Sequence, residues 1–187
     1  MSSHLSWSPH RHILVFEPIC TNEIMIATSS ASERLRTDLI ALNETPLEFI
    51  SAGISSSADI NDDFTWNATL LGPSDTPYVG GLFFFVLIFP KTYPSLPPSI
   101  RCTTKVYHPN IAPAGGELHL PILAQQDWSC SEQTVTDILR SMCEVFINPI
   151  TKAGDYIQNH EIANLYKSNK SKFNEYAKDW TKKYAMW

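Results

Sequence analysis

The chain has 187 residues, of which 43% are hydrophobic and 18% charged, and its formal net charge is −5. A chain of this length supports one compact domain that can bury roughly 70% of its unfolded surface. The acidic balance argues against nucleic acid as the main partner, because phosphate binding depends on an excess of Lys and Arg. The longest apolar run, Leu82 to Phe89, is far shorter than the roughly 20 residues that span a bilayer. We expect a cytoplasmic or nuclear protein that binds neither nucleic acid nor membrane.

The four cysteines show neither CxxC spacing nor a histidine at zinc-finger spacing; they are Cys20, Cys102, Cys130 and Cys143. The sequence therefore indicates no metal site and no redox motif, and we expect no cofactor. Free thiols in a reducing compartment are the simplest interpretation.

Residues 1–30 are rich in Ser and His and have weak periodicity, so they are predicted to form a flexible extension ahead of a core domain at residues 31–187. The first helix is predicted in "ASERLRTDLIALNET", with Ser32 as its N-cap and Pro46 beyond its end. Its apolar residues recur at helical spacing: Leu35, Leu39 and Leu42.

The middle of the chain has the pattern of antiparallel strands. "FTWNATLLG" alternates apolar and polar residues, as a half-buried strand does. The turn "GPSDTPYVGG" joins it to "LFFFVLIF", which is rich in aromatic residues and predicts a central strand. The prolines of "YPSLPPSI" cannot continue a ladder and predict a rigid loop before a short strand at about residues 100–104.

Helices are predicted for the rest of the chain. Ser129 and Glu132 have the spacing of a capping box ahead of a core-facing helix. Its apolar positions are Val135, Ile138, Leu139, Met142, Val145 and Phe146. A shorter helix is expected around residues 161–167. The last helix carries the stripe Phe173, Tyr176, Ala177, Trp180 and Tyr184, while the lysines of "KSNKSK" and "TKK" are interpreted as a solvated face.

In this order and spacing, the motifs "GPSDTPYVGGLFFF", "FPKTYPSLPP", "TTKVYHPNI", "DWS" and "EIANLYKSNKSKFNEYAKDWTKKYAM" resemble the ubiquitin-conjugating enzymes, closest to the small, broadly acting single-domain members. The resemblance covers roughly residues 31–187. It implies an α+β fold: one helix, a four-stranded antiparallel meander and about three C-terminal helices. It also implies ubiquitin or a ubiquitin-like protein as a partner, together with an active conjugating enzyme or a ligase.

In that family a cysteine about ten residues after the His of a His-Pro-Asn triplet carries ubiquitin as a thioester, since a thiolate is both a strong nucleophile and a good leaving group. The resemblance assigns Asn110 to the oxyanion and His108 to the turn that presents it. In "GELHLPIL", however, His119 stands where the cysteine belongs, Pro121 replaces an acidic residue, and the loops before His119 and after "INP" are longer.

The resemblance also identifies two binding surfaces. Arg34, Ser95, Leu96 and Ser129 match positions of the ligase-facing surface. Ser51 matches a serine of a non-covalent ubiquitin-binding face on the sheet.

Several roles of the site residues stay open. His119 could attack an acyl group, but an acyl-imidazole is labile in water, so we favour a polar residue that fills a former groove. Cys130 is an alternative thiol, although it falls eleven positions beyond His119. Asn110 could simply brace its own turn. A metal shared by His108 and His119 lacks further ligands.

These patterns favour a catalytically inactive variant that acts as a non-covalent partner or regulator in ubiquitin transfer. One alternative is an active transferase that uses Cys130 or His119. A second is a scaffold or adaptor with no ubiquitin role.

Overall fold

The computed structural model describes residues 31–56, 63–152 and 156–186, so the predicted extension at 1–30 lies outside the described residues. The elements, in order, are helix α1 (Ala31–Glu44), strands β1 (Ile50–Ile54), β2 (Thr65–Leu71), β3 (Leu82–Ile88) and β4 (Ser99–Cys102), the short 3-10 helix η2 (Pro121–Leu123), and helices α2 (Val135–Ile147), α3 (His160–Ser168) and α4 (Lys170–Tyr184). The expected α+β fold, with one helix before the strands and three α-helices after them, is confirmed in this part of the chain.

The four strands form one antiparallel sheet in the order β1-β2-β3-β4, which is the predicted meander. Alternation along β2 buries Trp66, Ala68 and Leu70 on one side, because successive side chains of a strand point to opposite faces. Phe64 lies just before the strand and not within it. β4 ends at Cys102, two residues earlier than expected.

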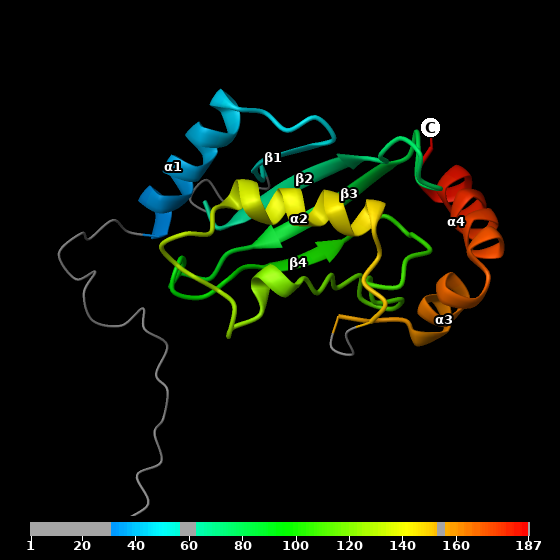
Figure 1. Ribbon diagram of the computed structural model, residues 1–187. Helices are drawn as coiled ribbons and strands as arrows, with labels where there is room; N and C mark the ends of the chain where they lie inside the picture. The colour runs from blue at the N-terminus through cyan, green and yellow to red at the C-terminus, as the bar shows by residue number, and fades with distance from the viewer. Residues whose placement is uncertain (1–30, 57–62, 153–155, 187) are drawn as a thin grey trace, which may run out of the picture.

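Helix α2 crosses the inner face of the sheet (Figure 1). All six of its predicted core residues are buried, and the ring of Phe146 lies 5.1 Å from that of Phe83 and 6.1 Å from that of Phe85. The predicted capping box was wrong. Thr134 is the N-cap, and it exchanges hydrogen bonds with Asp137, because a cap must directly precede the first helical turn.

The two outer helices follow the predicted stripes only in part. In α1, Leu35 and Leu42 are buried, but Ala31 is already helical, so Ser32 lies inside the helix and the N-cap prediction for it was wrong. In α4, Phe173 and Ala177 are buried, whereas Trp180 remains 39% exposed. One edge of the α4 stripe therefore faces outward.

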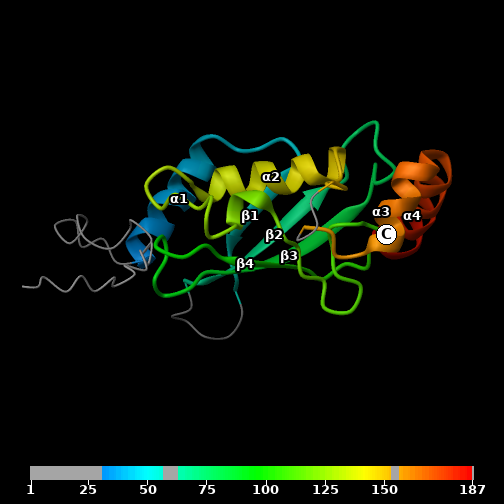
Figure 2. The ribbon, with the colours of Figure 1, turned by 60° about the horizontal axis from the view of Figure 1, so that its bottom comes forward.

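Helices α1 and α2 cover one face of the sheet, and α3 and α4 pack at one end of it (Figure 2). No described helix covers the opposite face in this view, and it carries the partly exposed side chains Leu71, Phe84 and Ile88. Among the described residues, no helix combines the length and apolar character that crossing a membrane requires.

Candidate functional site

His108 is a buried structural residue. Its side chain is fully buried and its ring stacks on Phe146 at 4.9 Å. Nδ1 accepts the Asn110 backbone N–H at 3.1 Å, so Nε2 carries the proton and donates to the Val145 carbonyl at 3.1 Å. Burial lowers the pKa of the imidazole from 6.5 to about 4, although the hydrogen bond to Val145 opposes the shift. The ring is therefore neutral at pH 7 and holds the turn.

The Asn110 side chain is fully engaged by the loop that follows α2. Its amide group donates to the carbonyl oxygens of Ile150 and Tyr156, both at 2.8 Å. Its carbonyl oxygen accepts the Ile150 N–H at 2.9 Å. Since an asparagine amide has only two N–H donors, neither remains for an oxyanion in this arrangement. The bracing role predicted as the alternative for Asn110 is the one that this geometry favours.

His119 is exposed and lines a groove of about 280 Å³. Its neighbours Leu118 and Leu120 are each 2% exposed. Successive side chains here therefore alternate, with the two leucines in the core and His119 on the groove. Tyr156 lines the same groove, and its backbone carbonyl is one of the two that Asn110 binds. The turn and the groove are thus connected through one residue of the loop after α2.

The loop before His119 is held against the edge strand β4. Isolated bridges pair Arg101 with Glu117 and Ile111 with Leu118. Gly116 has φ +76°, and a Cβ there would lie 2.1 Å from the Cys102 carbonyl oxygen. Only glycine fits both the left-handed backbone and this close approach. Gly116 therefore lets this loop fold back onto the sheet.

The described cysteines lie away from this groove. Cys102 is 5% exposed on β4, and burial raises the pKa of its thiol to about 12. Cys143 lies on α2, and burial raises the pKa of its thiol to about 11. Cys130 is disulfide-bonded. The expectation that Cys130 is a free thiol was therefore wrong, since nothing in its spacing marks it as half of a disulfide.

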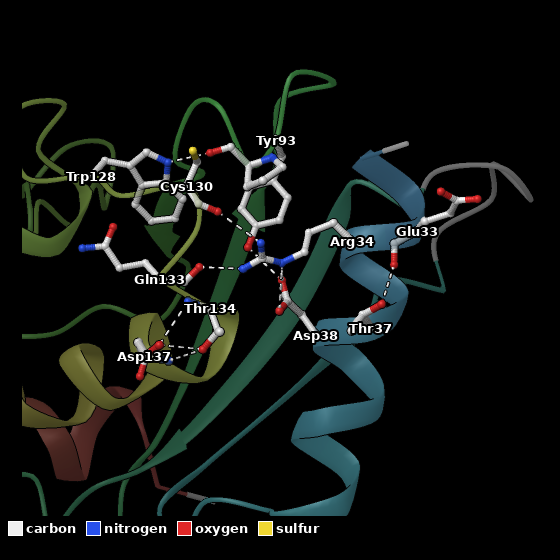
Figure 3. A network of polar contacts seen from close by, with 11 residues as sticks. Glu33, Arg34, Thr37, Asp38, Tyr93, Trp128, Cys130, Gln133, Thr134 and Asp137 are labelled. Atoms are coloured by element: carbon white, nitrogen blue, oxygen red, sulfur yellow. Dashed lines mark hydrogen bonds and ion pairs between the residues drawn. The ribbon is translucent and has the colours of Figure 1, made fainter. Parts of the chain in front are cut away.

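A polar network fixes the loops that hold Tyr93 and Cys130 to α1 (Figure 3). The Arg34 guanidinium binds the Asp38 carboxylate at 3.2 Å and also donates to the carbonyl oxygens of Cys130 and Gln133, at 3.2 and 2.7 Å. The Tyr93 hydroxyl donates to Asp38 at 2.8 Å. Burial raises the pKa of Asp38, while the Tyr93 hydrogen bond and the Arg34 charge oppose the shift.

The structure brings the predicted ligase-facing residues into one region, but it gives Arg34 an internal role. The Trp128 indole N–H donates to the Pro94 carbonyl at 2.7 Å, which ties the loop that holds Ser129 to the loop that holds Ser95 and Leu96. Leu96 is 41% exposed and Ser95 is exposed, whereas the Arg34 side chain is only 20% exposed. The partners of Arg34 in the distant loop lie 96 and 99 residues away. No local pattern could have revealed them.

Ser51 lies on the open face of the sheet. It is exposed and pairs with Thr69 on β2, which in turn pairs with Phe84 on β3. Phe84 is 39% exposed. Ser51 thus borders the partly apolar surface that α1 and α2 leave uncovered. Within the described ranges, no group of three His, Cys, Asp or Glu side chains is arranged to hold a metal ion.

The model of the family described as "Ubiquitin-conjugating enzyme" matches residues 34–181. The chain belongs to this family. It is 33% identical to a protein from Plasmodium yoelii, assigned as a ubiquitin conjugating enzyme, whose crystal structure superposes with a TM-score of 0.71 over 82% of this chain and 94% of that one. It is 30% identical to the E2 domain of a Toxoplasma gondii ubiquitin conjugating enzyme, with a TM-score of 0.69 over 81% of this chain and 97% of that one.

Proposed function

We propose that this chain is a variant of the ubiquitin-conjugating enzymes that forms no ubiquitin thioester and acts as a non-covalent partner or regulator in ubiquitin transfer. The observation that carries the proposal is the exposed His119 on the groove, at the position that the family gives to cysteine. An imidazole can be acylated, but the product hydrolyses too readily to serve as a carrier.

Other groups of the chain support the same function. With a thiol pKa of about 11, Cys143 presents only about one thiolate in 10⁴ molecules at pH 7. Cys130 is disulfide-bonded. The Asn110 amide group donates both of its hydrogens to backbone carbonyl oxygens. Neither a reactive thiol nor a free oxyanion donor is available from these residues.

The first test is a loading assay on the full chain with activating enzyme, ATP and labelled ubiquitin, resolved on non-reducing and reducing gels beside an active conjugating enzyme. We expect no adduct on this chain. A reducible adduct that disappears in Cys130→Ala would refute the proposal and identify a relocated carrier thiol. An adduct that survives reduction but disappears in His119→Ala would refute it in favour of an acyl-histidine.

The second test concerns ubiquitin binding without covalent transfer. We expect the amide signals of β1 and β3 to shift when ubiquitin is titrated into the labelled chain, and Ser51→Arg to remove these shifts. Ser74→Arg is the matched control, because Ser74 is exposed in the turn between β2 and β3. If ubiquitin does not bind and no active conjugating enzyme co-purifies, the chain is a scaffold without a ubiquitin role.

Restoring the thiol tests whether this chain has lost only the cysteine nucleophile or whether the residues around it have changed as well. We expect His119→Cys to leave ubiquitin transfer far below that of an active relative, because Pro121 and the two longer loops have changed the surroundings of the groove. Near-normal transfer by this single variant would show that only the nucleophile was lost.

A further inference from the structure

A second and larger cavity lies between residues 101–116 and the helix pair α3–α4. It measures about 640 Å³ and shares no lining residue with the groove at His119. Its walls include Lys105 and Tyr107 from the loop after β4, Glu161 from α3, and Trp180 and Tyr184 from α4. This volume lies within the range of about 300–1,000 Å³ that is typical of ligand sites.

Four aromatic rings form a continuous row, and three of them, Tyr107, Trp180 and Tyr184, line this cavity. Tyr107 lies 5.8 Å from both Tyr176 and Trp180, and Trp180 lies 5.2 Å from Tyr184. Part of the row is open to solvent, because Tyr176 at one end and Trp180 within it are 38% and 39% exposed. Large aromatic side chains of this kind supply the anchor contacts of many protein interfaces.

Cations lie at both ends of the aromatic row. The ammonium groups of Lys105 and Lys183 lie 5.6 and 4.9 Å from the Tyr184 ring, and that of Lys172 lies 5.7 Å from the Tyr176 ring. Arg101 also lines the cavity. Residues 160–186 hold six lysines against three acidic residues, whereas the whole chain has a formal net charge of −5. This end of the molecule is basic in an otherwise acidic protein.

Two carboxylates limit the positive charge. Glu161 lines the cavity, and its charge helps to raise the pKa of Tyr107, although burial is the larger cause. Glu117 lies 4.0 Å from Arg101. The surface therefore carries separated cations beside a row of aromatic rings and is not uniformly positive.

We propose that this surface binds a short acidic segment of a partner protein whose aromatic side chain enters the cavity and packs on Trp180. The acidic residues of the segment would pair with Lys105, Lys172 and Lys183, while Glu161 would accept a backbone N–H. A peptide fits better than a nucleic acid, because a long polyanion would also meet the negative charge of the remaining chain. The proposal does not depend on a role in ubiquitin transfer.

The test uses the full chain and a labelled peptide in which glutamates flank one tryptophan. We expect amide shifts confined to residues 101–116, 159–162 and α4, and binding that weakens as salt is added. Lys105→Glu should weaken binding by about fivefold or more. Lys91→Glu should leave binding unchanged, since Lys91 is an exposed lysine outside the cavity. Lys183→Glu gives a second charge reversal at an exposed position.

Two control peptides and an oligonucleotide complete the experiment. Replacing the tryptophan by alanine, or the glutamates by lysines, should abolish the shifts. The proposal is overturned if the acidic peptide gives no shifts at about 1 mM, if the lysine peptide binds equally well, or if both charge reversals leave binding unchanged. Tighter binding of a single-stranded oligonucleotide would also overturn it, in favour of a nucleic-acid surface.

Discussion

Replacing Arg34 by methionine should destabilise the protein by about 2–4 kcal/mol at neutral pH. Methionine keeps most of the apolar stem but removes the guanidinium that binds Asp38 and the carbonyl oxygens of Cys130 and Gln133. Asp38 is 4% exposed, so its carboxylate would lose its cation while remaining buried. For a domain of this size, the loss corresponds to a fall of about 5–15 °C in Tm.

The assay is urea unfolding of the variant and the unchanged chain at pH 7 and at acid pH. Burial already raises the pKa of Asp38, and Arg34 is one of the groups that oppose the shift. Removing Arg34 therefore raises this pKa further, and the ionised carboxylate costs stability as pH rises through it. The stability difference between the two proteins should be largest at pH 7 and should shrink as Asp38 becomes protonated at acid pH.

Arg36→Met is the matched control on the same helix. The Arg36 side chain is 67% exposed and lies 3.4 Å from Asp63, so its loss should cost less than about 1 kcal/mol. Equal losses in the two variants would refute the reasoning, because they would show that the Arg34 network adds no more than a surface ion pair. A loss at Arg34 that does not change with pH would contradict the role given to the Asp38 charge.

Three further predictions concern groups that lie wholly or partly inside the protein. Asn110→Ala should lower the free energy of unfolding, measured in urea, by about 2–4 kcal/mol, because one N–H and two carbonyl oxygens of the loop after α2 lose their hydrogen-bond partner. A loss below about 1 kcal/mol would contradict the bracing role. With its pKa near 4, His108 should stay neutral in NMR titrations down to about pH 5, and its unfavourable protonation should lower stability between its ordinary pKa and pH 4. Cys143 should be alkylated far more slowly in the folded chain than in urea, because burial raises its thiol pKa to about 11; equal rates would contradict its burial.

Local sequence patterns correctly predicted those elements in which the spacing of the apolar residues matches the spacing of the buried side chains. The alternation of Trp66, Ala68 and Leu70 placed β2, and the apolar spacing from Val135 to Phe146 placed α2, because one face of each element packs into the same core. The cap of α2 was missed because Ser129 and Thr134 both precede an acidic residue by three positions. Only Thr134 directly precedes Val135, and adjacency to the first helical residue decides between them.

The parts of the site that depend on long-range contacts could not be predicted. The Arg34 and Asp38 pair has the i, i+4 spacing that a sequence reveals, but Tyr93, Cys130 and Gln133 reach it from distant loops. The residues around Cys130 in the sequence do not indicate its disulfide either. Because Cys130 is not a free thiol, the cysteines no longer support the expected reducing compartment, and the localisation stays a prediction.

The position of Arg34 has a consequence for ligase binding. A ligase that used this guanidinium as a contact would have to break its bonds to Asp38 or to the carbonyl oxygens of Cys130 and Gln133. Such a contact would expose a buried carboxylate or leave loop carbonyls unpaired, and either change offsets the binding energy gained. Leu96 meets no such penalty, because it is already 41% exposed at the neighbouring loop. Any ligase that docks on this face would therefore draw its affinity from Leu96 and the adjacent backbone, with Arg34 holding the two loops in place beneath it.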